Sequence, residues 1–337
     1  MSTLDRIDSS RARLIVGSLL AVVVLGGVVA ARSEFSLDRL ITVGFVTRSL
    51  EMATPIALAA IGGLYAEKSG VFNIGLEGFM IFGAFSTAAT MYALGGTSPT
   101  QTHLWLAILA AVGISVLLTA VYAVVLIRYK ADQIVAGLAV WFLALGFAPF
   151  VAATIWGSRS SPGLTSIDTL AFGQSPMVFL TAVLVGVSWV VLYRTRYGYW
   201  IRAAGENPEA LDTAGVDVNR VRYATLLFSG AMAGLGGAVL LANAGNFVGT
   251  GQTMVDGRGW IGIVAYLFGN YNPVGAAMAA LLFGALDMLN VQFQTVGIDV
   301  PARLVNLFPY VAVLVVLTAW GKTRMPSKVG EPYETEE

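Results

Sequence analysis

Apolar runs of about 20 residues recur along the 337-residue chain, and they constrain its fold more than any other feature. A run of this length, wound as a helix, crosses a hydrocarbon core roughly 30 Å thick. Hydrophobic residues make up 56% of the sequence and charged residues only 12%, about half the charge of a soluble domain. The sequence therefore predicts an all-α polytopic membrane protein with a single transmembrane domain over residues 1–337.

Ten membrane spans are expected, and their even number places both termini on one side. With that side cytoplasmic, 14 of the 20 Lys and Arg residues fall in or beside cytoplasmic segments, which is the usual bias. The zero net charge gives no electrostatic case for nucleic acid, and the absence of cysteine excludes disulfides and thiolate metal sites. The expected spans are roughly 14–31, 42–65, 70–94 (interrupted), 104–127, 133–157, 177–193, 223–243, 256–269, 274–292 and 304–320.

Two stretches are too rich in glycine for one clean helix: YAEKSGVFNIGLEGFMIFGAF, residues 65–85, and NAGNFVGTGQTMVDGRGW, residues 243–260. Non-helical backbone survives at membrane depth only where protein buries it or where it lines a polar cavity. Each stretch is preceded by a glycine pair, at 62–63 and at 236–237. The pairs favour two related halves with broken helices, although close helix packing explains them equally well. Each stretch therefore points to an internal pathway.

Polar side chains inside the expected spans are the candidates for a substrate path, because an ionisable group there costs about 2.5 to 3.5 kcal/mol on insertion scales. Such groups usually face protein or water and often mark function. The candidates are Glu51, Asn73, Glu77, Asn243, Asn246 and Asp287, with Phe79 as an aromatic surface.

Each candidate also has a structural interpretation, and the sequence leaves both open. Glu51 lies three residues from Arg48, close enough for an ion pair on one helical face. Glu77 could share a face with Asn73, four residues away, or bind exposed backbone N–H groups of its own broken helix, which we favour. The two candidate asparagines after residue 242 could satisfy freed backbone groups, and Asp287 could hydrogen-bond another helix.

A polar segment separates the sixth and seventh expected spans: RTRYGYWIRAAGENPEALDTAGVDVNRVRY, residues 194–223. Asn207 can cap a helix, Pro208 suits its first position, Glu209 favours its positive end, and Gly215 can end it. The segment therefore predicts a helix of about two turns over residues 208–214, on the cytoplasmic side.

Two motifs carry a resemblance to a known family. GENPEALDTAG, within the polar segment, resembles the EAA-type loop of ABC importer permeases, whose helix docks on the ATP-binding subunit. EKSGVFNIGLEGFMIFGAF, residues 67–85, is similar to the signature of the nucleoside and simple-sugar permeases, which are related to the branched-chain amino acid permeases. The resemblance implies a type II ABC importer-like fold and makes residues 194–222 the coupling loop. It implies ATPase coupling by Arg202, Asn207, Pro208, Glu209, Ala210 and Gly215.

The same resemblance implies what the protein does and with which partners. The chain would be the permease subunit of an ATP-driven importer that moves nucleosides or simple sugars by alternating access. Its partners would be ATP-binding cassette subunits, a second homologous permease in a heterodimer, and an extracytoplasmic substrate-binding lipoprotein. The location would be the plasma membrane of a prokaryote, with both termini cytoplasmic.

No cofactor, metal or catalytic residue is expected on this chain. Gly321, Lys322 and Thr323 match the end of a Walker A loop, but Val316 stands where its first glycine belongs, so ATP belongs to the partner subunit. Two other classes stay open. An ion-coupled secondary transporter of a small polar solute also uses broken helices, and it would need no ATPase partner. A membrane enzyme is disfavoured because His103 is the single histidine and no serine lies in a nucleophile elbow. The acidic tail, residues 325–337, is expected to be flexible.

Overall fold

The computed structural model describes residues 42–296 and 325–333 of the chain. The expected spans 14–31 and 304–320 lie outside these residues. The described part is helical, and its one β-contact is an isolated bridge between Ser160 and Val248. Its helices are α2 (Val43–Lys68), α3 (Leu76–Gly95), α4 (Gln101–Ala123) continued by a π-helix (Val124–Arg128), α5 (Gln133–Trp156), a 3-10 turn (Ala171–Gly173), α6 (Pro176–Arg194), α7 (Arg196–Glu206), α8 (Pro208–Thr213), α9 (Val218–Ala244), α10 (Arg258–Phe268) and α11 (Pro273–Val296).

Six of the described helices are long and apolar enough to cross a membrane: α2, α3, α4 with its π-helix, α5, α6 and α9. This confirms a polytopic, multi-pass membrane fold. The expected crossing at 256–269 is wrong as a complete span, because the 11 residues of α10 extend only about 16 Å at 1.5 Å per residue. The expected span 70–94 is also shortened, since its helix begins at Leu76.

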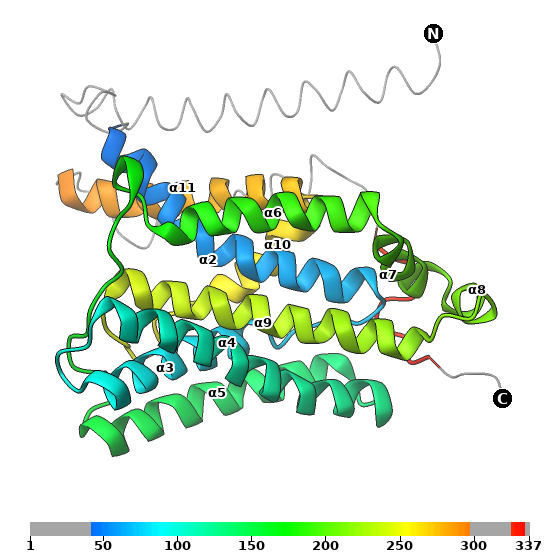
Figure 1. Cartoon of the computed structure of the whole chain (residues 1–337), viewed down its shortest axis with the longest axis horizontal. Helices are drawn as coiled ribbons and strands as arrows, with labels where there is room; N and C mark the ends of the chain where they lie inside the picture. The colour runs from blue at the N-terminus through cyan, green and yellow to red at the C-terminus, as the bar shows by residue number, and fades with distance from the viewer. Residues whose placement is uncertain (1–41, 297–324, 334–337) are drawn as a thin grey trace, which may run out of the picture.

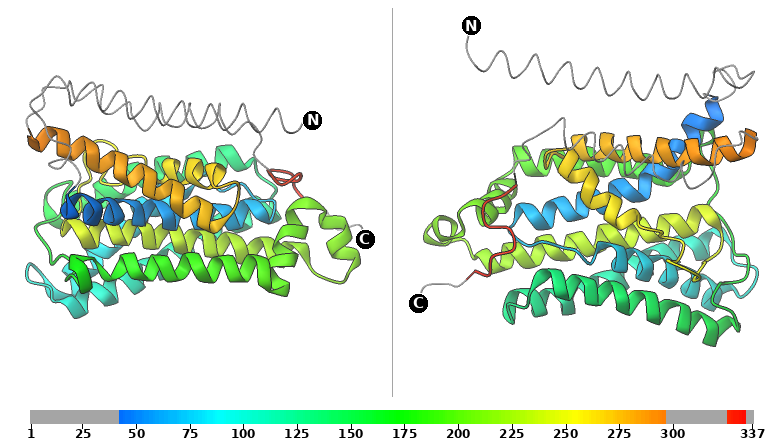
Figure 2. Two further views of the ribbon diagram at one scale, coloured as in Figure 1. Left: turned by 90° about the horizontal axis from the view of Figure 1, so that it is seen from above. Right: turned by 180° about the vertical axis from the view of Figure 1, so that it is seen from behind.

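The helices form an elongated bundle with α2, α3 and α9 at its centre (Figures 1 and 2). Helices α10 and α11 pack on α2, and α4 packs against both α3 and α9. In the most apolar window of α2, 83% of the residues are buried, against 17% in that of α5. The buried core therefore follows the two helices that precede the broken stretches, and α4, α5 and α6 form the outer layer.

Glycines allow the central helices to approach closely. A Cβ atom on Gly83 of α3 would strike the backbone oxygen of Gly234 on α9, and one on Gly237 would strike that of Met80. A Cβ on Gly62 of α2 would come within 2.7 Å of the Ser229 oxygen. Small residues at such crossings are typical of membrane helices. Gly62 and Gly237, one from each glycine pair, therefore allow close helix packing.

The outer helices expose large apolar side chains. Leu109 and Leu117 of α4 are 69% and 70% exposed, and Phe150 of α5 is 71% exposed. Leu109 and Leu117 are eight residues apart and so share one helical face. Such a surface is costly in water but suits lipid, because the helices satisfy their own backbone hydrogen bonds.

The bundle has two distinct ends. Helices α2 and α6 finish, and α9 begins, at the end that carries α7 and α8 (Figure 1). Helix starts are capped by short polar side chains, for example Asp132 before α5 and Asp217 before α9. At the other end, α9 terminates at Gly245 with a positive φ of 70°.

Candidate functional site

The first broken stretch, residues 69–75, joins α2 to α3 without helical structure. Gly70 turns the chain with a φ of +93°, which L side chains rarely adopt. The backbone N–H of Phe72 then donates to Gln133 Oε1 of α5 at 2.6 Å. Side chains of neighbouring helices thus replace the hydrogen bonds that a helix would have supplied.

Asn73 completes this replacement. Its Nδ2 donates to Ser229 Oγ of α9 at 2.9 Å, and its Oδ1 accepts from the backbone N–H of Gly75 at 3.0 Å. The side chain is fully buried. The expectation that Asn73 and Glu77 share a helical face is wrong, because the helix begins only at Leu76. Both polar ends of Asn73 therefore serve the structure of the stretch.

The second broken stretch occupies residues 245–257, between α9 and α10. It is held by the chain segment that follows α5. The N–H of Phe247 donates to Ser161 Oγ at 2.8 Å, and the N–H of Ser161 returns a bond to the Phe247 oxygen at 2.9 Å. The N–H of Leu164 donates to the Gly245 oxygen at 2.6 Å.

The backbone of this segment makes the hydrogen bonds to freed backbone groups that we considered for the side chains of Asn243 and Asn246. The carbonyl of Ala242, at the end of α9, accepts from the N–H of Ile167 at 2.7 Å. Both asparagines are partly exposed, and neither amide hydrogen-bonds to any other residue in the described ranges. Their contribution to a substrate path stays a prediction.

Glu77 joins the two broken stretches. Its Oε1 accepts from the backbone N–H of Gly257 at 2.8 Å, and its Oε2 from that of Gly259 at 2.7 Å. A Cβ on Gly259 would lie 2.6 Å from the Glu77 Cα atom, so only glycine allows this approach. Glu77 is 1% exposed. The structural interpretation that we favoured for Glu77 is right in that its carboxylate binds backbone N–H groups. These groups belong to the start of α10, however, and not to its own helix.

Two helix N-termini consequently meet at one buried carboxylate. Glu77 lies in the first turn of α3, and its acceptors bind the first turn of α10. A helix start carries unsatisfied N–H groups and roughly half a positive charge. A single carboxylate between two such ends offsets both, and it fixes the position of α3 relative to α10.

Arg258 and Asp287 lie beside this junction. Arg258 Nη2 is 3.5 Å from Asp287 Oδ2 of α11, and the two side chains are 18% and 25% exposed. Arg258 also donates to the oxygen of Val255 at 3.1 Å, which helps to hold the second broken stretch. Arg258 is not among the candidates expected from the sequence, although a cation between two glycines in an apolar region is a usable signal.

Glu51 lies on α2, the helix on which α11 with its Asp287 packs. Its Oε2 is 3.3 Å from Arg48 Nη1, so the expected ion pair is confirmed. Gly284, one turn before Asp287, packs against the backbone of Ser49 and Ala53. Helices α2 and α11 thus bring Glu51 and Asp287 to neighbouring segments.

The aromatic candidate, Phe79, is packed in the core, and the rings of Phe247 and Trp260 also pack against other rings. Phe79 is 1% exposed and meets Tyr122 edge to face with 5.6 Å between ring centroids. Trp260 meets Trp141 in the same way at 5.5 Å. Phe247 is fully buried. These rings fill the bundle in this conformation, and Phe79 has no exposed face for stacking.

A second buried carboxylate was missed as a site residue. Glu67, near the end of α2, accepts hydrogen bonds from the hydroxyls of Tyr266 and Tyr271, the latter at 2.5 Å. Lys68 lies 5.8 Å from the Tyr271 ring centroid. About 200 positions separate these partners, so no local pattern indicates the contact.

The short helix predicted over residues 208–214 is present as α8. Asn207 Oδ1 accepts from the N–H of Ala210 at 3.1 Å to start α8, and Gly215 adopts a φ of +81° just after it. Glu209 and Ala210 are exposed, whereas Pro208 is buried against the body. The expected helix over 208–214 is therefore confirmed, and the coupling role stays a prediction.

Helix α7, which the sequence analysis missed, precedes α8 and packs on the first broken stretch. A Cβ on Gly205 would strike the backbone oxygen of Lys68. Arg202 of α7 lies over the rings of Tyr193 and Tyr199, at 5.4 and 4.9 Å from their centroids. The polar segment is thus a folded platform on the end of the bundle.

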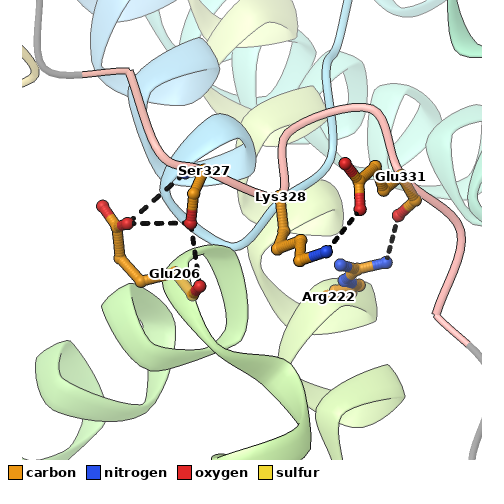
Figure 3. A network of polar contacts seen from close by, with 5 residues as sticks. All are labelled: Glu206, Arg222, Ser327, Lys328 and Glu331. Atoms are coloured by element: carbon orange, nitrogen blue, oxygen red, sulfur yellow. Dashed lines mark hydrogen bonds and ion pairs between the residues drawn. The ribbon is translucent and has the colours of Figure 1, made fainter.

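Part of the expected tail lies against the bundle, and its flexibility stays a prediction. Residues 325–333, which we call the strap, lie against α7, α8 and α9 (Figure 3). Ser327 Oγ donates to the oxygen of Glu206 at 2.8 Å, and Lys328 Nζ lies 2.9 Å from Glu331 Oε2. The hydrogen bond to Glu331 raises the pKa of Lys328 above its ordinary value. Backbone and side-chain hydrogen bonds thus connect the strap to the body, while most of its residues remain exposed.

Comparison with known proteins places the chain in a family. The model of a family described as the permease component of branched-chain amino acid transport systems matches residues 45–317. Guanosine ABC transporter permease protein NupQ of Bacillus subtilis is 34% identical over 312 residues, covering 86% of this chain and 95% of NupQ. Nucleoside ABC transporter permease protein NupC of Lactococcus lactis is 34% identical over 307 residues, covering 86% and 96%.

A more distant relative carries a different substrate in its name. Putative glucose ABC transporter permease protein TsgC13 of Haloferax volcanii is 30% identical over 270 residues, covering 76% of this chain and 79% of TsgC13. No solved structure matches the chain. The multi-pass helical fold agrees with the match to a permease family. The chain therefore belongs to the family of branched-chain amino acid transport system permease components, and it is a non-enzymatic permease subunit of an ABC importer in the plasma membrane.

Proposed function

We propose that this permease imports nucleosides, by alternating access coupled to a separate ATPase. The observation that carries the substrate class is the 34% identity to both NupQ and NupC over nearly their whole lengths. The 30% identity to TsgC13 makes simple sugars the second candidate. Neutral, hydroxylated substrates suit a chain whose most buried ionisable groups, Glu67 and Glu77, are bound by tyrosines and backbone N–H groups.

The proposed architecture is a type II importer-like permease with ten spans, two related halves and cytoplasmic termini. Helices α2 and α9 run in opposite directions, and each is followed by a broken stretch and a helix that starts within the bundle (Figure 2). This arrangement is typical of transporters whose repeated halves enclose the substrate site. We place the path beside the junction, next to Asp287 and Glu51, because these carboxylates keep partly exposed side chains.

Coupling would pass through α8. Its exposed residues, Glu209, Ala210 and Thr213, form a face that no other part of the described chain covers. We assign Arg202, Asn207, Pro208 and Gly215 supporting roles, since they shape the platform that presents this face. The partners would be ATP-binding cassette subunits and an extracytoplasmic substrate-binding lipoprotein.

A second, different permease would complete the membrane core. Bacillus subtilis holds, besides NupQ, guanosine ABC transporter permease protein NupP, which is 26% identical to this chain over 293 residues. Two permeases for one substrate in one organism, one nearer to this chain and one more distant, support a heterodimer.

Transport in proteoliposomes tests the proposal. The chain is reconstituted with its neighbouring permease and ATPase, and uptake of labelled nucleoside and labelled glucose is measured with ATP hydrolysis. Wild type should take up nucleoside in an ATP-dependent manner, and Glu209→Arg should lose uptake while the complex stays folded. Asp168→Arg, a charge reversal on an exposed residue at the other end of the bundle, is the matched control. Uptake that needs no ATPase and follows an ion gradient would replace the importer by a secondary transporter.

A further inference from the structure

The strap connects three parts of the protein that lie far apart in sequence. The N–H of Lys328 donates to the Gly205 oxygen at the end of α7 at 2.9 Å, and the N–H of Gly330 donates to the Gly70 oxygen at 3.1 Å. Tyr333 Oη donates to Asp212 Oδ2 of α8 at 2.8 Å. One short segment is thus bonded to the platform, to the coupling helix and to the first broken stretch.

Arg222 of α9 hydrogen-bonds both to the strap and to the first broken stretch. Its Nε donates to the Ser69 oxygen at 3.1 Å, and its Nη1 donates to the Glu331 oxygen at 2.9 Å (Figure 3). The side chain is 3% exposed, and its guanidinium lies 5.9 Å from the Tyr333 ring centroid. A Cβ on Gly70 would come within 2.7 Å of Arg222 Nη2. A buried cation thus ties the strap to the start of the broken stretch.

The coupling helix also contacts the body through apolar side chains: Leu211 forms a small core with Ala204 of α7 and Val218 of α9, and the side chain of Tyr333 packs against this core. Residues of α8, of the strap and Arg222 of α9 line one cavity of about 490 Å³: Pro208, Glu209, Asp212, Thr213, Arg222, Lys328, Glu331, Pro332 and Tyr333. A subunit that docks on α8 therefore meets the strap as well. Movement of α8 can reach the body through this small core, and it can reach the strap through Tyr333, whose side chain packs against the core and whose hydroxyl bonds to Asp212.

We propose that the strap, residues 325–333, is a relay that links the coupling helix α8 to the first broken stretch, so that α8 and Gly70 move together. The proposal rests on the proposed coupling through α8. The broken stretch is 7 residues long and carries Asn73, with Glu77 just beyond it. A shift at Gly70 is therefore passed directly to the junction that fixes α3 against α10. Arg222 and Tyr333 are positioning residues in this relay.

The test compares two truncations in the assembled transporter. A stop after Arg324 removes the strap, whereas a stop after Tyr333 keeps it and removes only residues 334–337. With the strap removed, nucleoside uptake per ATP hydrolysed should fall about fivefold or more, which is the low end of coupling between sites. ATP hydrolysis should continue, because the face of α8 that docks the ATPase remains. The shorter truncation should behave as wild type.

Tyr333→Phe covers the case in which the strapless complex does not assemble. This variant keeps the ring and removes only the bond to Asp212, so the complex stays intact while uptake per ATP falls by a smaller factor. Asp212→Ala removes the acceptor of the same bond and should give a similar fall, and the double variant should add nothing further. Unchanged coupling in the strapless complex, or in Tyr333→Phe, would overturn the relay. Loss of ATP-dependent uptake in wild type would instead refute the importer assignment, so the two failures are distinguishable.

Discussion

The carboxylate of Glu77 accepts a 2.7 Å hydrogen bond from the backbone N–H of Gly259, 182 residues further along the chain. Glu77 is the second residue of α3, and Gly259 is the second residue of α10. The contact therefore joins the first turns of two helices that both start inside the bundle. Since each helix start presents N–H donors and partial positive charge, the carboxylate stabilises an arrangement that would otherwise leave donors unsatisfied in an apolar interior.

Replacing Glu77 should destabilise the protein and remove transport with it. Glu77→Ala leaves two buried N–H groups without acceptors, at about 1 to 3 kcal/mol each. Glu77→Gln keeps one oxygen but turns an NH₂ group toward the other N–H, so an intermediate loss is expected. Thermal unfolding of the purified complex in detergent measures both.

An exposed carboxylate supplies the control for this pair of variants. Asp168→Asn makes the same chemical change as Glu77→Gln on the surface, and its unfolding temperature should match wild type. If Glu77→Ala unfolds like wild type but fails in uptake, the carboxylate acts on the substrate, and its structural assignment is wrong.

The length and position of most helices could be predicted because a membrane selects apolar runs of a fixed length. Helices α5 and α6 lie within about three residues of their expected limits. The expectation fails for α10, since a half-length helix next to glycine-rich chain has the same hydropathy as the end of a full span. The contacts of the strap could not be predicted for a different reason: they come largely from backbone groups, which composition does not report.

The contacts of the candidate site likewise fall into those that the sequence could predict and those that it could not. Local spacing predicted the pair of Arg48 with Glu51 and the cap of α8 by Asn207, because both contacts fall within one turn. The partners of Glu67 and Glu77 could not be predicted, because they are about 180 to 200 residues away and depend on how the helices pack. Sequence therefore identified Glu77 as a buried carboxylate that needs partners but missed Glu67, and the fold determines which partners both have.

Close packing of α3 on α9 gives a second prediction. In Gly83→Ala the new methyl would strike the backbone of Gly234, so the helices must separate, at about 1 to 3 kcal/mol. In Gly113→Ala of α4 the methyl meets no atom within 4 Å, and the better helix propensity of alanine should leave stability equal or raised by up to about 1 kcal/mol. The unfolding temperature should therefore fall in Gly83→Ala and stay equal or rise in Gly113→Ala, and an unchanged or raised unfolding temperature in Gly83→Ala would contradict the packing.

The buried triad of Glu67, Tyr266 and Tyr271 gives a third. Tyr266→Phe and Tyr271→Phe each remove one hydroxyl that donates to the Glu67 carboxylate. Hydrogen bonds to charged groups contribute about 1.5 to 3 kcal/mol, so each variant should unfold earlier than wild type. Because both bonds serve one carboxylate, the losses in the double variant should not add. Tyr129→Phe, at a side chain 72% exposed, should change nothing.

The pair of Arg258 and Asp287 separates transport from stability. The two side chains are 18% and 25% exposed, and a partly solvated pair should contribute no more than about 1 kcal/mol to folding. If the pair borders the path, Asp287→Asn should lower nucleoside uptake about tenfold, equal to 1.4 kcal/mol, with little change in unfolding temperature. Arg258→Lys retains the charge opposite Asp287 and should keep more uptake than Arg258→Gln. A fall in unfolding temperature with normal uptake would instead make Asp287 a structural partner of α10.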